Sequence, residues 1–448
     1  MCYYFVKKEE LWMTEYKKYN KKYVSKNFSH NLIMSQHAML DIDAKNHLNN
    51  RHVCVLGDND ELEKYMLANI LQANCNYVIP DTNGCLYELT GDFLRSQGYT
   101  VQVLDFAHPS ENAQYNPLRN LSEHTEIDVL ELSHILLQNG IDADFTDQDK
   151  HLLFAAIYYV LTLPKAQQTL STVYTTLNKI YQEHDWATLN ALVQYALKKI
   201  SEKACQMWTI PQEESQLMNS LQRVINSVSG FAYQHTESFT SNDNVSLDTI
   251  QQGKRALFII DHLCYHEIQA ILYTQILHQC MRATGNSDSS GIQPLMIFLP
   301  KAIPELSRKL HLLHKHQTYI SFLYSSISSV KRDYPNDWNS VIGGCDNLLY
   351  LGSKDFATLE YMSQTLGYRP LDKKALMKRR LLHNSHINYQ LVRREILTPE
   401  EVSKIPDDQC IVIVRNEKPF LDKKYVLCMH PNFQYLSDTT MRGYYEKF

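Results

Sequence analysis

The sequence lacks the signatures of several common classes of protein. Its ten cysteines form no Cys-x-x-Cys pair, which argues against structural zinc and disulfides and fits reduced thiols in a cytosolic setting. The longest apolar run, residues 152–163, has 12 residues, whereas a membrane helix needs about 20. No apolar core of a signal peptide, no Gly-x-Ser-x-Gly elbow and no cysteine nucleophile motif is present. We therefore expect a globular protein without a transmembrane span.

Charge is balanced over the whole chain but not at its amino terminus. The formal net charge of −5 gives no overall attraction to nucleic acid, so any such binding must be local. Residues 1–26 carry seven Lys and three Glu, a net charge of +4. This segment is either a solvated amphipathic helix or tail, or a peripheral contact with anionic lipid or a partner. The expected location is the cytoplasm, with a peripheral position at the inner face of the cell membrane as the alternative.

Apolar runs alternate with segments of helical period along most of the chain. Expected strands cover residues 52–57, 76–81, 99–106, 255–261, 294–300, 318–324, 347–352 and 409–415. Most of these runs are continuously apolar, which is typical of strands buried on both faces of a parallel sheet. Helical segments between them predict a doubly wound α/β domain with a mostly parallel sheet flanked by helices.

The alternation stops between about residues 121 and 248, where helical patterns follow one another. The simplest interpretation is an all-α domain inserted into the α/β domain. The expected divisions are a basic amino-terminal segment at 1–30, the first α/β part at 31–120, the inserted helical domain at 121–248, and the second α/β part with carboxy-terminal strands at 249–448. The basic segment Leu371–Asn388 is expected to form an exposed loop.

Residues 52–70 have the layout of a phosphate-binding loop: an apolar strand, a glycine and a helix. Such a loop needs glycines that let backbone N–H groups converge on phosphate, and a Lys-Ser/Thr pair for phosphate and Mg²⁺. Between Gly57 and Lys64 there is no second glycine, no Ser and no Thr. The four acidic residues there, together with Lys64, give a local charge of −3. These carboxylates suit helix capping and repel a triphosphate.

Several segments, in order, resemble the type IV coupling proteins of the TraG/TraD family. They are residues 31–57, the stretch around NYVIPDTNG (76–84), YNPL (115–118), residues 337–367 and residues 394–433. The resemblance spans about residues 31–435 and includes the helical insertion. It implies a RecA-like P-loop NTPase fold and a hexameric ATPase that delivers DNA–relaxase substrates to a conjugative secretion system.

The departures from the family pattern fall on the catalytic positions. The family's Gly-Lys-Thr aligns with Asp60, Glu61 and Leu62, in a loop about two residues shorter. Its strand-end Asp-Glu pair, which handles Mg²⁺ and water, aligns with Pro300 and Lys301. The former nucleotide site is therefore expected at Gly57, Asp60, Glu61, Leu62, Lys64, Asp81, Pro300, Lys301 and Ser325, where Ser325 replaces a glutamine and Asp81 survives from Asp-Pro-Lys-Gly-Glu. The family's amino-terminal membrane helices have no counterpart in the sequence.

A retained scaffold with lost catalytic groups predicts a pseudo-ATPase that binds no cofactor and acts through protein contacts. Its expected partners are an active coupling ATPase, a relaxase or another secretion substrate. The alternative is an active ATP-driven DNA translocase that uses ATP and Mg²⁺, with Lys64 or Lys301 in place of the missing lysine. A third interpretation is a decaying product of a mobile element. The sequence leaves the oligomeric state open.

Two further groups of residues were weighed. His311, His314 and His316, and the pair His262 and His266, have spacings that suit a metal, but no carboxylate or cysteine completes either set, so no metal is predicted. The strongest basic patch consists of Lys373, Lys374, Lys378, Arg379 and Arg380. It is either a solvated loop or a contact with the DNA phosphate backbone, without interleaved aromatic residues for base stacking.

Overall fold

A computed structural model describes the protein at residues 19–20, 22–42, 50–106, 108, 113–119, 121, 126–138, 145–200, 214–245, 247–261, 266–283, 292–303, 306–375 and 388–437. The chain divides into two compact units. The first unit comprises Met1–Asn74, Phe298–Pro300 and Tyr319–Phe448, and the second comprises Cys75–Ile297 and Lys301–Thr318. The four-part division expected from the sequence stays a prediction.

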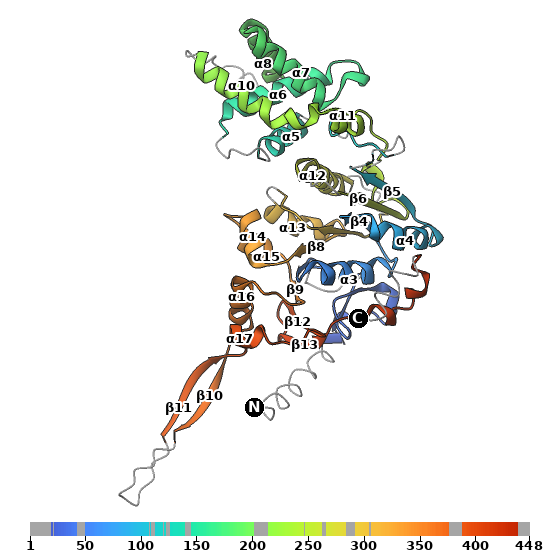
Figure 1. Ribbon diagram of the computed structural model, residues 1–448, viewed down its shortest axis with the longest axis vertical. Helices are drawn as coiled ribbons and strands as arrows, with labels where there is room; N and C mark the ends of the chain where they lie inside the picture. Colours follow the sequence, from blue (N-terminus) through green and yellow to red (C-terminus); the bar gives the residue numbers. More distant parts are fainter. Residues whose placement is uncertain are drawn as a thin grey trace, which may run out of the picture. The chain divides into compact units, whose positions relative to one another are not determined.

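Five strands of the first unit pair in the order β13, β12, β9, β3 and β8 (Figure 1). They are β3 (Val53–Leu56), β8 (Thr318–Tyr324), β9 (Asn347–Tyr350), β12 (Gln409–Val414) and β13 (Phe420–Lys423). Strand β3 runs parallel to β8 and β9, whereas β12 runs antiparallel to β9 and β13. Every residue of β3, β8 and β9 is buried, which explains their continuously apolar sequences.

Helices and two small hairpins complete the first unit. The α-helices are α3 (Asn59–Ile70), α14 (Ile327–Asp333), α15 (Trp338–Gly343), α16 (Phe356–Leu366) and α17 (Pro399–Val402). Short 3₁₀ helices are η1 (Phe28–His30), η5 (Leu427–Met429) and η6 (Phe433–Tyr435). Strands β1 (Asn31–Ile33) and β2 (Met39–Asp41) form one antiparallel hairpin.

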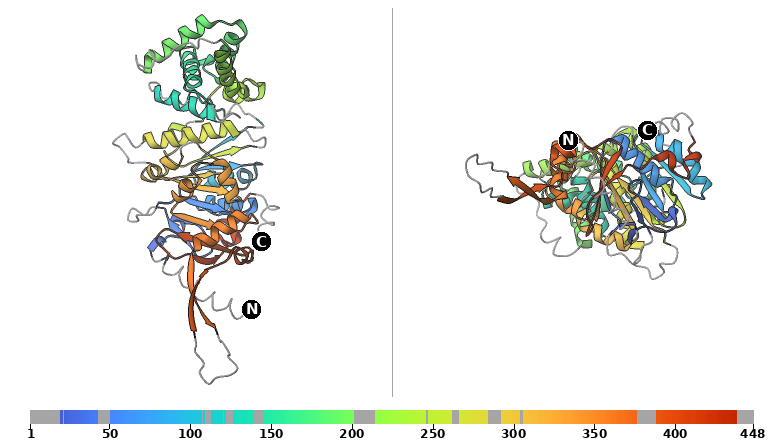
Figure 2. Two further views of the ribbon diagram at one scale, coloured as in Figure 1. Left: turned by 90° about the vertical axis from the view of Figure 1, so that its left-hand side faces the viewer. Right: turned by 90° about the horizontal axis from the view of Figure 1, so that it is seen from below.

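The hairpin of β10 (Tyr368–Ala375) and β11 (Asn388–Glu395) contradicts the expected loop at Leu371–Asn388. Its register runs from Tyr368 opposite Glu395 to Ala375 opposite Asn388. The prediction was wrong for these residues because cross-strand backbone hydrogen bonds outweigh the weak strand propensity of a charged segment. The hairpin is a separate two-stranded sheet beside α16 and α17 (Figures 1 and 2). Residues 376–387 lie outside the described part of the chain.

Four strands of the second unit pair in the order β7, β4, β6 and β5, and all pairs are parallel. They are β4 (Asn76–Asp81), β5 (Thr100–Asp105), β6 (Arg255–Ile260) and β7 (Leu295–Leu299), whose last two residues belong to the first unit. Helices α4 (Cys85–Ser96), α12 (His266–Ala283) and α13 (Leu306–Lys315) follow β4, β6 and β7. This is the β–α alternation that the sequence predicted.

Between β5 and β6 the described residues form helices and no strand. The helices are α5 (Glu126–Gln138), α6 (Asp147–Leu161), α7 (Leu170–Glu183), α8 (Trp186–Ile200), α10 (Glu214–Val228) and α11 (Gln234–Thr240), with the short η2 (Lys165–Gln167), η3 (Ser229–Ala232) and η4 (Leu247–Thr249). Local capping sets their ends: Thr146 and Asp149 form a capping box at the start of α6. His184 ends α7 in the left-handed region at φ 52°.

Candidate functional site

The turn after β3 keeps one glycine, and packing explains why. The Gly57 N–H donates to the carbonyl oxygen of Tyr324 at 3.1 Å, and the Leu351 N–H donates to that of Leu56 at 2.7 Å. A Cβ atom on Gly57 would lie only 2.9 Å from the Cβ of Leu351. The turn is therefore wedged between the ends of β8 and β9, and only glycine fits there.

The amino end of α3 is occupied by the chain's own carboxylate. Asp58 is the N-cap residue, and its side chain accepts a hydrogen bond from the Glu61 N–H at 3.0 Å. The free N–H groups of a first helical turn are what a phosphate loop offers to its ligand. Capping by Asp58 satisfies one of them internally. Asp60 is exposed on the same turn, and Leu62 is buried.

Glu61 lies between two lysines. Its Oε1 is 3.1 Å from Nζ of Lys64, and its Oε2 is 3.2 Å from Nζ of Lys424. The side chains of Lys64, Lys424 and Glu61 are 23%, 16% and 17% exposed, so this is a half-buried ion cluster. Lys64 belongs to the same helix, whereas Lys424 follows β13 at the other end of the chain. The sequence carries no local signal for Lys424 at this place.

A small cavity lies beside this cluster. Glu61, Lys64 and Lys424 line it together with apolar side chains that include Met34 and Leu351. Its volume is about 20 Å³, which is room for about one water molecule. Glu61, Lys64 and Ala68 follow one another along one flank of α3, so the ion cluster and the cavity lie on that flank of the helix.

In the second unit, Asp81 serves as a cap. Its Oδ1 accepts a hydrogen bond from the Gly84 N–H, and its Oδ2 accepts one from the Tyr87 N–H, both at 2.9 Å. Burial raises the pKa of the Asp81 carboxyl, although the N–H groups of this turn oppose the shift. Gly84 has φ 82°, a conformation that favours glycine. Asp81 and Gly84 therefore shape the start of α4.

Lys301, a candidate from the sequence, is half-buried and paired with Asp261. Its Nζ lies 3.4 Å from Oδ2 of Asp261, which also accepts a hydrogen bond from Nε2 of Gln269 at 2.6 Å. Asp261 follows β6, and its side chain is 6% exposed. Sequence reasoning missed Asp261, although an aspartate directly after an apolar strand is a usable signal. In the first unit, Pro300 follows β7 and has no N–H to donate.

Ser325 follows β8 and is exposed. Its Oγ lies 3.3 Å from Oγ of Ser329, and its carbonyl oxygen accepts a hydrogen bond from Oγ of Ser353 at 3.3 Å. Because the preceding residue, Tyr324, accepts the Gly57 N–H, the structure brings Ser325 to the end of the sheet where the β3–α3 turn lies. The described contacts of Ser325 are those of a loop residue.

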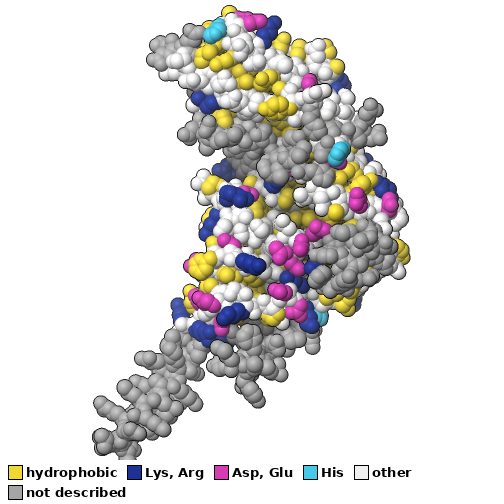
Figure 3. Space-filling view, in the orientation of Figure 1, with side chains coloured by type: hydrophobic (Ala, Val, Ile, Leu, Met, Phe, Trp, Pro, Cys, Tyr) yellow, Lys and Arg dark blue, Asp and Glu magenta, His cyan; other side chains and the backbone are white. Residues whose placement is uncertain are grey.

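The remaining sequence candidates are only partly within the described chain. Lys373 and Lys374 belong to β10, whereas Lys378, Arg379 and Arg380 lie outside the described residues. On one side of the hairpin pleat the register places Arg369, Lys373 and Arg394. Figure 3 shows acidic and basic side chains interspersed on one face of the described residues.

Metal ligands and membrane spans were sought in the same part of the chain. His311 and His314 lie on α13 and His316 directly after it, while His262 is outside the described residues. No described set of three His, Cys, Asp or Glu residues is arranged to hold a metal ion. No described helix has both the length and the apolar character needed to cross a bilayer.

Comparison with solved structures identifies the fold as the RecA-like P-loop fold, with a mostly parallel sheet flanked by helices. The bacterial conjugative coupling protein TrwBdeltaN70, in an unbound form, matches with a TM-score of 0.68 at 13% identity, over 91% of this chain and 90% of that one. TrwB in complex with ADP and Mg²⁺ matches with 0.61 at 14% identity, over 84% of each chain. VirB4 of Thermoanaerobacter pseudethanolicus matches with 0.53 at 10% identity, over 89% and 97%.

The sequence also matches a family model. The model for type IV secretory system conjugative DNA transfer covers residues 64–437. The chain therefore belongs to this family of conjugative DNA transfer proteins. A search of curated proteins found no match.

Proposed function

We propose that this member of the conjugative DNA transfer family does not hydrolyse ATP and acts through protein contacts. The observation that carries the proposal is the Glu61 carboxylate between Lys64 and Lys424 at the amino end of α3. Glu61 belongs to the first turn of α3, so its carboxylate puts negative charge beside the helix end that a phosphate loop offers to its anion. A pseudo-ATPase keeps the scaffold for docking while its nucleotide site is filled from within.

Electrostatics supports the closed site. An incoming triphosphate would have to displace Glu61 from two half-buried lysines and then lie near Asp58 and Asp60. Each like-charge pair at about 4 Å costs roughly 1 kcal/mol in water and about 4 kcal/mol near a protein surface. The alignment places Lys301 where the family has its water-orienting carboxylate, and an ammonium group only donates hydrogen bonds and cannot accept a proton from an attacking water.

The proposed partners are proteins of the transfer apparatus. An active coupling ATPase or a relaxase-bearing secretion substrate is the class of partner that a catalytically silent scaffold of this family would bind. We place the protein in the cytoplasm, with the inner face of the cell membrane as a peripheral site of action.

ATP with Mg²⁺ is expected to leave the thermal stability of the full chain unchanged. A ligand present at 100 times its Kd stabilises the native state by about 2.7 kcal/mol, which moves Tm by several degrees. We expect a shift below about 1 °C. Differential scanning calorimetry measures this, with TrwB, which has been obtained in complex with ADP and Mg²⁺, as the positive control. A stabilisation that disappears in the Lys64→Ala variant would instead favour the active DNA translocase.

We further propose that the β10–β11 hairpin touches the DNA backbone through Lys373 and Lys374. The hairpin is a sheet of its own, and its register places Arg369, Lys373 and Arg394 on one face and Lys374 on the other. Isolated two-stranded hairpins are marginally stable in water, so a partner along this surface would stabilise it. Cations spaced along a strand suit phosphates and carry no sequence information.

The Lys373→Gln, Lys374→Gln double variant is expected to bind duplex DNA of any sequence more weakly. Each lost phosphate contact lowers the slope of log K against log salt by about 0.9, so the slope should fall by about 2. Fluorescence anisotropy over a salt series measures it. The control is Lys354→Gln with Lys404→Gln, which removes the same charge from exposed positions outside the hairpin. Equal slopes in the two variants would mean that the hairpin lysines are solvated.

A further inference from the structure

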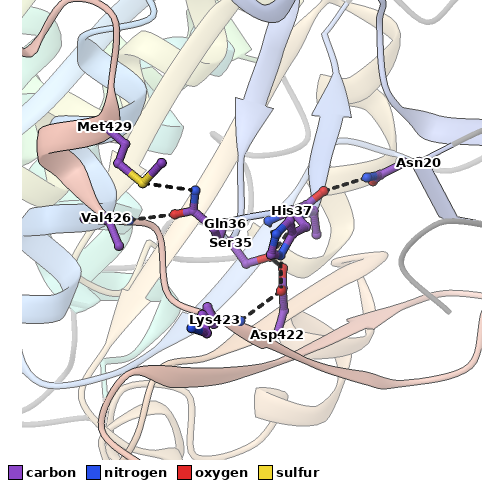
Figure 4. A network of polar contacts seen from close by, with 9 residues as sticks. Asn20, Ser35, Gln36, His37, Asp422, Lys423, Val426 and Met429 are labelled. Carbon is purple, nitrogen blue, oxygen red and sulfur yellow. Dashed lines mark hydrogen bonds and ion pairs between the residues drawn. The ribbon is translucent and has the colours of Figure 1, made fainter. Parts of the chain in front are cut away.

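The cation that pairs with Glu61 on α3 lies on a segment held in place by the opposite end of the chain. We name residues Asp422–Met429 the strap; it contains Lys424 and ends with η5. We name Ser35–His37, between β1 and β2, the latch turn. Figure 4 shows the latch turn against the strap.

Asp422 is the main attachment of the strap. Its side chain is 4% exposed, and its carboxylate receives three contacts from the latch turn. Oγ of Ser35 donates to Oδ2 at 2.5 Å, the His37 N–H donates to Oδ2 at 2.9 Å, and Nδ1 of His37 lies 2.7 Å from Oδ1 (Figure 4). A buried carboxylate depends on such donors, because its desolvation is otherwise uncompensated.

Gln36 holds the strap on both sides of Lys424. Its N–H donates to the Lys423 carbonyl oxygen at 2.9 Å, and its Oε1 accepts the Val426 N–H at 3.0 Å. Its Nε2 also lies 3.6 Å from Sδ of Met429. Gln36 therefore contacts Lys423, which precedes Lys424, and Val426 and Met429, which follow it.

Lys424 itself makes one backbone bond and one ion pair. Its N–H donates to the Asp408 carbonyl oxygen at 2.8 Å, and its Nζ pairs with Glu61. A half-buried ion pair of a flexible lysine gains little unless its backbone is already positioned. The latch turn supplies that positioning.

We propose that the strap is an autoinhibitory plug, and that the latch turn sets whether Lys424 stays on Glu61. Asp422 and Lys423 stay paired with β12. Releasing Asp422 from the latch turn therefore loosens the strap beyond Lys423, separates Lys424 from Glu61 and uncovers the flank of α3 that carries Glu61 and Lys64. The route to this switch is the amino-terminal segment, because Nδ2 of Asn20 donates to the His37 carbonyl oxygen at 2.7 Å. The inference rests on the proposed function, because it describes what keeps nucleotide away from the β3–α3 turn of a pseudo-ATPase.

The test measures the accessibility of Lys424 without any nucleotide. The full chain and the variants Ser35→Ala, His37→Ala and Asp422→Asn are treated briefly with an amine-acetylating reagent, and acetylation of Lys424 is quantified by mass spectrometry. Losing a hydrogen bond to a charged group shifts an opening equilibrium by about tenfold. We expect Lys424 to be acetylated about tenfold faster in His37→Ala, with faster amide exchange in strap peptides.

Lys22→Ala is the matched control. Lys22 also joins the amino-terminal segment to the carboxy-terminal region, through an ion pair of 2.7 Å with Glu417, but it does not touch the strap. It should leave Lys424 labelling unchanged. Unchanged amide exchange in β3 and β9 shows that a variant is folded. If Asp422→Asn does not fold, Ser35→Ala, the mildest of the three changes, still tests the proposal.

Two results would overturn the plug: unchanged Lys424 labelling in all folded latch variants, or an equal rise in Lys22→Ala. These outcomes are distinct from failure of the proposed function. The latter shows as ATP-dependent stabilisation of the unaltered chain, which the labelling experiment does not involve.

Discussion

Replacing Arg223 with alanine is expected to lower the free energy of unfolding by about 3–5 kcal/mol. Arg223 on α10 forms a two-pronged pair with Asp149 on α6: Nε lies 3.1 Å from Oδ2, and Nη2 lies 3.0 Å from Oδ1. The Asp149 side chain is fully buried. Removing the guanidinium leaves the buried Asp149 carboxylate with the Thr146 N–H as its donor and no cation beside it. Burying a charge without its partner costs far more than a surface pair gains.

Urea denaturation followed by circular dichroism measures this loss. The control is Lys150→Ala on the same helix, which breaks an exposed pair of 3.0 Å between Lys150 and Asp147 and should cost about 0.5 kcal/mol or less. The experiment also addresses the proposed domain boundaries: if residues 121–248 fold as a unit of their own, Arg223→Ala moves one of two transitions. A loss no larger than that of the control would contradict the buried-pair argument.

Acidification from pH 6.5 to pH 4 is expected to remove up to about 3 kcal/mol of stability through His430 alone. The side chain is 3% exposed and packs against the rings of Phe28 and Tyr425. Its Nδ1 accepts the Asn432 N–H at 3.0 Å, which requires an unprotonated nitrogen. Burial lowers the pKa of His430 to about 4.

The sign follows from linkage. In the unfolded chain the pKa of a histidine is about 6.5, so below that pH the unfolded state binds a proton that the folded state excludes. The contribution is fully present above pH 6.5 and disappears as the pH falls toward 4. The pKa difference of about 2.5, at 1.36 kcal/mol per pH unit, sets the magnitude.

Urea denaturation at a series of pH values, with the full chain and His430→Gln, isolates this contribution. The difference in the free energy of unfolding between the two proteins should shrink as the pH falls from 6.5 to 4. Burial also raises the pKa of Asp81. Asp81 is present in both proteins, so its contribution to the pH dependence cancels in the difference. The control is His108→Gln, because the His108 side chain is 81% exposed. A pH-independent difference for His430→Gln would show that His430 does not titrate as its burial requires.

Elements of the fold that rest on local pattern could be predicted from the sequence. The apolar runs at 52–57 and 318–324 correspond to β3 and β8, which are buried throughout. The helical run between β5 and β6 follows from its 3.6-residue period. The conjugative-transfer family was identified from segments in order, and the family match at residues 64–437 confirms it.

Elements that rest on distant partners could not be predicted. The hairpin of β10 and β11 was taken for a loop because its charged residues carry little strand propensity, and pairing supplies what propensity does not. Glycine and acidic residues in the β3–α3 turn pointed to a lost phosphate loop, but not to what fills its place. Asp261 went unnoticed because its partner, Lys301, lies 40 residues away in the sequence.

The acidic stretch Gly57–Lys64 shows both what residue types determine and what tertiary contacts determine. Residue types alone excluded the usual triphosphate contacts, since the required lysine–hydroxyl pair is missing and carboxylates stand in its place. Residue types do not show whether the Glu61 carboxylate has a cation beside it. The register of β12 and β13 and the Ser35–His37 turn decide this, because they bring Nζ of Lys424 to 3.2 Å from Oε2 of Glu61. Capping and hydrophobic period act over one or two turns of chain, whereas a half-buried ion cluster is made by residues that meet only once the sheet has formed.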